Sequence, residues 1–201
     1  MIKPQIIAAT LVAFGVVISP KYPSLAQTGT TTTPQTQPST APTTSSLSAQ
    51  DKMFMIQAAE GGMAELQFAQ LALQKSSNDS VKDYAQRMID DHTKANDKLM
   101  AIAEQKGVTL PTTIGPKNEA VKAKLSKLSG TNFDKMYLSQ AGVSSHNQQA
   151  ALFKSEVQRG KDPDVQAFAA QTLPTVQEHL QMARSMAMGK KTSMNKMPAR
   201  Q

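Results

Sequence analysis

The chain has 201 residues and a formal net charge of +7, with no Cys, no Trp and only 4% aromatic residues. This length allows one domain with tails rather than two full domains. Because Cys is absent, the sequence excludes a disulfide framework, a thiolate zinc site, an iron–sulfur cluster and a cysteine nucleophile. The low aromatic content disfavours a protein that stacks nucleic-acid bases.

The positive charge lies mainly at the two ends of the chain. Two lysines precede residue 27, and four Lys or Arg residues lie in residues 189–201. Without these six residues, the net charge of residues 27–188 is only +1. We therefore expect no nucleic-acid partner, and at most a weak contact between a basic, disordered tail (189–201) and an anionic envelope surface.

Residues 1–26 have the pattern of a secretory signal peptide. A short basic start precedes a mainly apolar run (6–18), and Ser24 and Ala26 are small residues at positions −3 and −1 of a cleavage site. The alternative is an uncleaved membrane anchor, but the run is short for a hydrocarbon core of about 30 Å. We expect cleavage after Ala26 and export to the periplasm, the outer membrane or the cell exterior.

Residues 27–47 are rich in Thr, Pro and Ser and carry no charge. Such a segment cannot bury enough apolar surface to offset the entropy of ordering it. The sequence therefore predicts a disordered linker. O-glycosylation or spacing from a cell wall is the functional alternative to a plain tether.

Residues 48–188 show apolar positions at helical spacing, without sustained strand-like alternation, so an all-α domain is predicted. Capping residues, Gly and Pro delimit the helices. The predicted helices cover residues 48–75, 80–106, 132–159 and 162–189, with a loop at 108–116 that Pro116 ends, a short helix at 117–128, and a kink at Pro174.

Two parts of this domain resemble each other. Residues 51–54 (DKMF) match residues 134–137 (DKMY), and the similarity continues to the turns at Asp79 and Asp162. The four long helices thus form two related hairpins. Two hairpins joined by a connection of about 25 residues, here containing the short helix, define a four-helix bundle with one long crossover, which is the ferritin-like topology.

Four ionisable residues are predicted near the middle of this bundle: Glu65, His92, His146 and His179. Glu65, His92 and His179 fall on apolar helix faces, and His146 falls at the flank of one. Because a buried ionisable group must be paired, neutralised or metal-bound, the four are candidate ligands of a transition metal such as iron, zinc, copper or manganese. The alternative is a buried polar network without a metal.

Known catalytic patterns are missing from the sequence. The di-iron carboxylate motif Glu-x-x-His is absent, because Ile89 and Val176 stand three residues before His92 and His179. There is no Gly-rich phosphate loop, no G-x-S-x-G and no H-E-x-x-H. A binding module is therefore favoured over an enzyme.

Two weaker features have both a structural and a functional interpretation. Gly61 and Gly62 inside a predicted helix indicate close helix packing, or else a hinge. The methionines near the C-terminus indicate helix packing, or else thioether ligands for Cu(I). They are Met182, Met186, Met188, Met194 and Met197.

Motifs in both halves of residues 50–187 resemble those of a secreted bacterial family known as domain of unknown function 4142. The first half carries Phe54, Ala58-Ala59-Glu60-Gly61-Gly62, Glu65, Tyr84-Ala85 and Asp91-His92-Thr93, and the second carries Phe133-Asp134, His146, Asp162-Pro163, Phe168-Ala169, Pro174 and His179. The resemblance implies a ferritin-like fold and export to the periplasm or outer membrane. It implies no activity.

Three functions remain open at this point. The leading hypothesis is an exported ferritin-like module that binds a ligand or acts in envelope stress. The second is a periplasmic metal-binding or metal-dependent redox protein that uses Glu65, His92, His146 and His179. The third is a cell-envelope interaction protein that uses the linker and the basic tail. Elemental analysis of the purified protein, with His92→Ala and His179→Ala as controls, separates the first two, and the distances among the four side chains are the most informative structural measurement.

Overall fold

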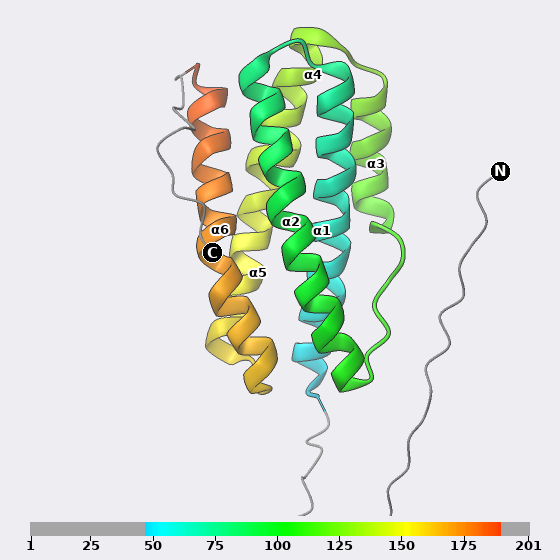
Figure 1. Cartoon of the computed structure of the whole chain (residues 1–201), viewed down its shortest axis with the longest axis vertical. Coiled ribbons are helices and arrows are strands. Elements are labelled where there is room, and N and C mark those ends of the chain that lie inside the picture. Colours follow the sequence, from blue (N-terminus) through cyan, green and yellow to red (C-terminus); the bar gives the residue numbers. More distant parts are fainter. Residues whose placement is uncertain (1–46, 190–201) are drawn as a thin grey trace, which may run out of the picture. The chain divides into compact units, whose positions relative to one another are not determined.

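The computed structural model describes residues 47–189, and every regular element within them is helical (Figure 1). The elements are α1 (Ala49–Lys75), α2 (Asp79–Lys106), α3 (Gly115–Ser126), α4 (Gly130–Tyr137), the π-helix η1 (Leu138–Ser145), α5 (His146–Arg159) and α6 (Pro163–Ala187). The all-α prediction is confirmed for this part of the chain. The predicted signal peptide, nearly all of the linker and nearly all of the tail lie outside the described residues.

The ends of the long helices follow from local capping residues. At α1, the Ser48 hydroxyl accepts from the backbone N–H of Asp51, and the Asp51 carboxylate accepts from the backbone N–H of Ser48, both at 3.1 Å. At α6, the Asp162 side chain accepts from the N–H groups of Asp164 and Val165. Gly107 ends α2 with φ of 65°, a left-handed conformation that favours glycine.

Two predicted boundaries are corrected by the structure. Pro116 does not end the loop, because α3 begins at Gly115 and takes Pro116 into its first turn. Proline has no backbone N–H, but an N–H in the first turn of a helix has no partner within the helix, so its loss costs nothing at Pro116. The predicted continuous helix 132–159 is divided into α4, η1 and α5. The π-helical turns contain more residues than α-helical turns, which changes the direction of every side chain that follows.

The long helices lie side by side (Figure 1). α1 packs mainly against α2, α5 packs mainly against α6, and α3 lies along α1. Pro174 lies inside α6 and cannot donate a hydrogen bond, so the carbonyl of Ala170 loses its usual helical partner. Within residues 47–189, no helix has both the length and the apolarity needed to cross a membrane.

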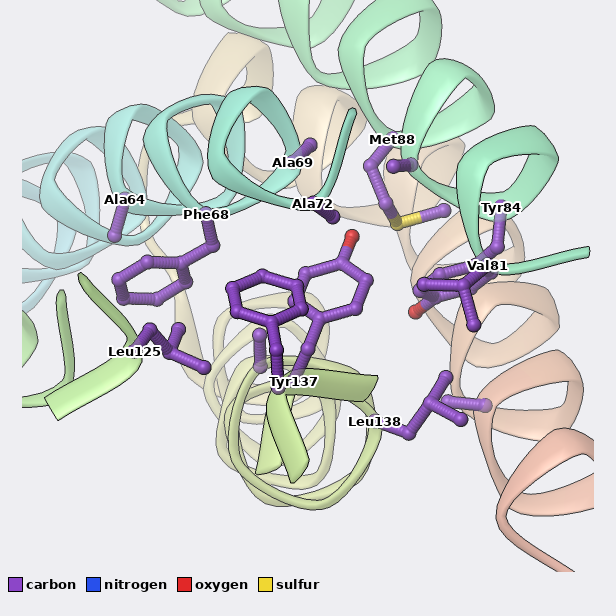
Figure 2. Packing of buried hydrophobic residues seen from close by; sticks show 14 of the residues in the cluster. Ala64, Phe68, Ala69, Ala72, Val81, Tyr84, Met88, Leu125, Tyr137 and Leu138 are labelled. Atoms are coloured by element: carbon purple, nitrogen blue, oxygen red, sulfur yellow. The ribbon is translucent and has the colours of Figure 1, made fainter. Parts of the chain in front are cut away.

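The apolar core forms two clusters. The first includes Phe68, Tyr84, Leu125 and Tyr137 (Figure 2), and the second includes Phe54, Leu99, Phe153 and Phe168. Along the chain, each histidine falls between buried residues of the first cluster and buried residues of the second. On α2, for example, His92 lies between the first-cluster residues Val81, Tyr84, Ala85 and Met88 and the second-cluster residues Leu99 and Ala103. The histidines therefore occupy a polar layer between two apolar ones.

Gly61 and Gly62 in α1 make room for side chains from neighbouring helices. A Cβ atom on Gly61 would lie 2.7 Å from Nε2 of Gln149, and one on Gly62 would overlap Oδ1 of Asn96. Neither position has room for a methyl group unless the amide moves. This close approach accounts for the two glycines in the middle of a helix.

Candidate metal centre

Three histidines from three helical segments meet in the polar layer. The ring centroids of His92 and His146 are 5.7 Å apart, and each of these rings has its centroid 5.4 Å from that of His179. One ring nitrogen from each histidine lies within 4.8 Å of the other two. All three rings are buried, with exposed fractions of 5% for His92, 0% for His146 and 1% for His179. The cluster thus contains every histidine of the chain.

Hydrogen bonds to groups outside the cluster orient two of the rings. Nδ1 of His146 lies 3.0 Å from the carbonyl oxygen of Ala141, which can only accept, so this nitrogen carries the proton. Nε2 of His179 lies 2.9 Å from the carboxylate of Asp91 and donates to it in the same way. Each neutral ring then has a lone pair on its other nitrogen.

One nitrogen of each of the three rings is buried without a partner. Nε2 of His92, Nε2 of His146 and Nδ1 of His179 make no hydrogen bond within residues 47–189. Buried polar atoms normally have a partner, because an unpaired one loses the hydrogen bonds that water would supply. A bound ion or ordered water molecules could pair with these three nitrogens.

The site also keeps the histidines uncharged. Burial lowers the pKa of His92 well below its usual range, and the positive charge of a protonated His179 or His146 would lower it further. Burial lowers the pKa of His146 to about 3, although the carbonyl groups of Ala141 and Gly142 oppose this. Burial also lowers the pKa of His179, against the effect of Asp91. Neutral imidazole is the form that binds metals.

The π-helix η1 explains how His146 reaches this position. The backbone N–H of His146 bonds to the carbonyl of Val143, while the carbonyl of Ala141 accepts from the His146 ring. Gly142, inside η1, allows α6 to approach, because a Cβ atom there would lie 2.7 Å from Cβ of Ala183. η1 therefore orients the ring of His146, and its Gly142 lets η1 lie close to α6, the helix that carries His179. π-helical turns are frequent at functional sites.

A groove of about 790 Å³ between α2 and α6 reaches the cluster, with His92 and His179 in its wall. Arg87 lies in the same wall and joins the two helices. Its Nε is 3.2 Å from the Asp91 carboxylate, and its guanidinium is 3.5 Å from the Glu178 carboxylate. The groove therefore reaches two of the three histidine rings, while their unpaired nitrogens stay buried.

Glu65 is also buried, with 1% of its surface exposed, but it lies on another side of His146. Its Oε1 is 3.8 Å from Nδ1 of His146, the nitrogen that bonds to Ala141, and not beside the unpaired Nε2. Burial raises the pKa of Glu65 well above its usual range, against a hydrogen bond from Ser145. The structure thus brings the three predicted histidines together and places the predicted carboxylate next to them, outside the group of converging nitrogens.

Sequence reasoning missed the groups that orient the rings. Asp91 stands next to His92 in sequence, yet its partner is His179, because adjacent helical residues point about 100° apart. This difference in direction could have indicated that Asp91 contacts a residue of a neighbouring helix rather than His92. The carbonyl of Ala141 could not be found from the sequence, because its availability depends on η1.

The described part of the chain is thus an all-helical domain with a buried three-histidine cluster. The sequence matches the family model described as "Domain of unknown function (DUF4142)" over residues 35–186, and the chain belongs to this family. No curated protein sequence matches it.

Two solved structures have a similar fold. A DUF305 fragment from Deinococcus radiodurans is 17% identical, with a TM-score of 0.64, and the match covers 71% of this chain and 98% of that one. CopM in the Cu(II)-bound form is 13% identical, with a TM-score of 0.56, and the match covers 69% of this chain and 96% of that one. At these identities, the similarity shows a shared helical fold alone.

Proposed function

We propose that this protein is an exported metal-binding protein that holds one transition-metal ion between His92, His146 and His179. The observation that carries the proposal is the set of three buried, unpaired ring nitrogens, one from each histidine. A metal ion would pair with all three nitrogens at once, with His92 carrying its proton on Nδ1. The partners on the far sides, Asp91 and the carbonyl of Ala141, are the outer groups that metal-binding histidines usually have.

A purely structural network explains these atoms less well. In such a network, each buried imidazole nitrogen would have a hydrogen-bond partner, because leaving one unpaired costs about 1–3 kcal/mol. The cluster instead joins three neutral rings whose free nitrogens face no donor within residues 47–189. This arrangement lowers the stability of the metal-free domain and favours a bound ion, which would offset the cost.

Copper is the metal that we propose first. Imidazole ligands suit copper, zinc, iron and nickel, and Cu(II) has the highest affinity in the usual order of divalent metals. CopM, whose fold is similar, was solved with Cu(II) bound, which supports copper as the first metal to test. Three protein ligands leave one coordination position free, and the groove between α2 and α6 provides access to it. We assign Glu65 to the surroundings of His146 rather than to the metal.

The finer architecture and the location belong to the same proposal. We propose that α1–α2 and α4–α6 are two related hairpins of a ferritin-like four-helix bundle, supported by the internal repeat and by the packing of α1 on α2 and α5 on α6.

The proposed export of the protein is supported by the signal-like residues 1–26. Edman sequencing of the protein from a periplasmic fraction should begin at Gln27. Intact Met1 in the cytoplasm would contradict export.

The metal proposal is tested with purified protein stripped by a chelator and titrated with Cu(II) and, separately, with Zn(II). We expect one ion per chain, and a Cu(II) electron paramagnetic resonance spectrum with nitrogen hyperfine splitting. His92→Ala and His179→Ala should each weaken binding at least about tenfold. Gln177→Ala, an exposed change on α6, is the matched control. Binding that survives removal of all three histidines, or no binding of either metal, would reject the proposal.

A further inference from the structure

The groove between α2 and α6 has two halves of opposite charge, with His92 and His179 between them. One half, towards the beginning of α2, has four carboxylates and one guanidinium in its wall, from Asp83, Asp90, Asp91, Glu178 and Arg87. The other half has the ammonium groups of Lys94 and Lys98, opposite an uncharged stretch of α6. We call the first the acidic half, and its wall has a net charge of −3. The groove thus attracts cations at one end only.

Two carboxylates of the acidic half have no cationic partner within residues 47–189. Arg87 contacts the carboxylates of Asp91 and Glu178, at 3.2 and 3.5 Å. No ion pair involves Asp83 or Asp90, and both side chains are exposed. Exposed acids are common on protein surfaces, so these two identify a ligand only if a cation is placed to reach them.

The end of α6 lies beside this acidic half. α2 and α6 run antiparallel, because Lys106 at the end of α2 contacts Asp162 just before α6, and Asp91 contacts His179 halfway along both helices. The end of α6 and the beginning of α2 therefore lie at the same end of the bundle (Figure 1).

The chain leaves α6 at the mouth of the acidic half. Ala187 ends α6 eight residues after His179. Asp83 lies eight residues before Asp91, so it is level with Ala187, and both are about 12 Å from the level of the histidines. Gly189 has φ of 72°, a left-handed conformation that turns the chain away from the helix axis. The attachment point of the following residues thus lies next to Asp83.

The following residues have the charge and the length to fill the acidic half. Residues 190–194 (KKTSM) lie outside the described residues, but the sequence shows two lysines and then, three residues on, Met194. Five extended residues span at most about 17 Å. The histidines lie only about 12 Å from the end of α6. A segment that follows the groove therefore passes Asp83 and Asp90 with its lysines and reaches the histidines with its methionine.

We propose that the acidic half binds residues 190–194 of the same chain, with the two lysines beside Asp83 and Asp90 and with Met194 over the ring of His179. Methionine sulfur packs favourably against aromatic rings. Exposed ion pairs are weak singly, but a covalently attached segment has a high effective concentration at its own groove. The basic half repels the later cations of the tail, so the docked stretch ends at Met194.

The docking goes beyond the proposed metal centre and needs no metal. Its consequence rests on that centre: a docked tail covers the mouth of the groove and slows the passage of an ion. Because the tail docks with or without the ion, it changes the rate of exchange and not the affinity.

The docking is tested on the purified protein with its complete tail, in excess chelator. Because the chain has no Cys, Ser193→Cys provides a single attachment point for a nitroxide, which broadens amide resonances near it in the ¹⁵N-labelled protein. An undocked tail would broaden both sides of α6 alike. We therefore compare Gln86 and Asp90 in the groove with Asn147 of α5, which lies beside Arg184 on another side of α6. We expect stronger broadening at the two groove residues, and loss of this difference in about 1 M salt.

Two double variants of the tail test the register of docking. Lys190→Gln with Lys191→Gln should abolish the stronger broadening in the groove, because the segment loses both cations that face the acidic half. Lys196→Gln with Arg200→Gln removes two cations beyond Met194 and should leave the broadening unchanged. Equal broadening on both sides of α6 in the parent, or equal effects of the two double variants, would overturn the proposal.

A matched pair of variants tests the groove side of the contact. Asp83→Asn should weaken the broadening at Gln86, whereas Asp97→Asn, which changes an exposed carboxylate of α2 outside the groove, should not. Both variants should unfold at the same urea concentration as the parent, since both side chains are exposed. A loss of broadening in Asp97→Asn as large as that in Asp83→Asn would show a general effect of charge and reject docking in the groove.

The effect on exchange is measured separately, as the rate at which Cu(II)-loaded protein passes its ion to excess EDTA. The variant without Lys190 and Lys191 should release Cu(II) faster than the parent at the same equilibrium affinity, and the variant without Lys196 and Arg200 should release it at the parent rate. Equal rates in all three proteins would contradict the closing of the groove. A protein that binds no Cu(II) would instead reject the metal centre, and the docking result, obtained without metal, would be unaffected.

Discussion

Asp91 of α2 and His179 of α6 are joined by a hydrogen bond of 2.9 Å between the carboxylate and Nε2 of the ring. This bond places the ring proton on Nε2 and leaves the lone pair on Nδ1, the atom that has no partner. Arg87 holds the carboxylate from the other side, with its Nε 3.2 Å away. The orientation of His179 thus depends on a residue of another helix.

Replacing Asp91 with Ala should weaken metal binding about 10–100-fold, the usual cost of removing an outer partner of a ligating histidine. The ring would lose both its fixed tautomer and some basicity. Competition with a chromophoric chelator measures the affinity. Asp90→Ala is the control, since the Asp90 carboxylate is exposed and accepts a hydrogen bond from Gln86. Equal losses in the two variants would indicate a general effect of groove charge instead.

Gly142→Ala should destabilise the domain by about 1–3 kcal/mol, because the added methyl group would lie 2.7 Å from Cβ of Ala183. The contact lies four residues before His146 and four residues after His179, so forcing the helices apart should also weaken metal binding. Urea unfolding of the metal-free protein and chelator competition measure the two effects.

A second substitution distinguishes a steric clash from a simple change in helix propensity. Ala183→Gly removes the methyl group that Gly142→Ala would meet. The double variant should therefore recover part of the loss caused by Gly142→Ala, even though Ala183→Gly alone costs about 1 kcal/mol in a helix. Strictly additive losses would show that the two positions do not touch.

The sequence predicted most helix ends correctly, because caps are local. Ser48, Asp162 and Gly107 act within a few residues of themselves, and the structure places each where its residue type indicated. The burial of Glu65 and His92 followed equally from helical periodicity, which needs only about 100° per residue. Both kinds of inference use information contained in one segment.

The remaining features depend on how the segments meet. Constant helical periodicity places His146 at the flank of its helix, whereas the structure buries it fully, since the π-helical turns of η1 rotate the residues that follow. The distances between the three rings depend on helix packing, which no single helix specifies. For the same reason, the sequence could not show that Glu65 lies beside Nδ1 of His146 rather than among the converging nitrogens.

His146→Gln should remove part of the acid sensitivity of the metal-free protein. The pKa of His146 falls from 6.5 to about 3 on folding, so the unfolded chain binds the proton more tightly and stability falls as the pH drops below 6.5. His146 should lower the free energy of unfolding of the wild type by about 2 kcal/mol when the pH falls from 7 to 5. Urea unfolding of both proteins at the two pH values, in excess chelator, measures the difference. The same pH dependence in both proteins would show that His146 is not buried in its neutral form.

Glu156 should affect the stability of the domain in the opposite direction, so that its contribution is lost as the pH rises. It is 1% exposed, and burial together with the nearby Asp51 carboxylate raises its pKa from 4.5 to about 7, while Gln50 acts against this. Because the folded state binds this proton more tightly, the stability it contributes is complete below pH 4.5 and is lost as the pH rises through about 7.

Glu156→Gln keeps the shape of the side chain but removes its titration, so the variant should lose less stability than the wild type between pH 5 and pH 8. Urea unfolding midpoints at the two pH values test this, with the exposed Glu119→Gln of α3 as control. Asp51 caps α1 and also accepts a hydrogen bond of 2.8 Å from the backbone N–H of Lys161, just after α5. Repulsion between an ionised Glu156 and Asp51 therefore acts where the beginning of α1 meets the end of α5. Parallel pH curves for Glu156→Gln and the wild type would show instead that Glu156 is already ionised at pH 5.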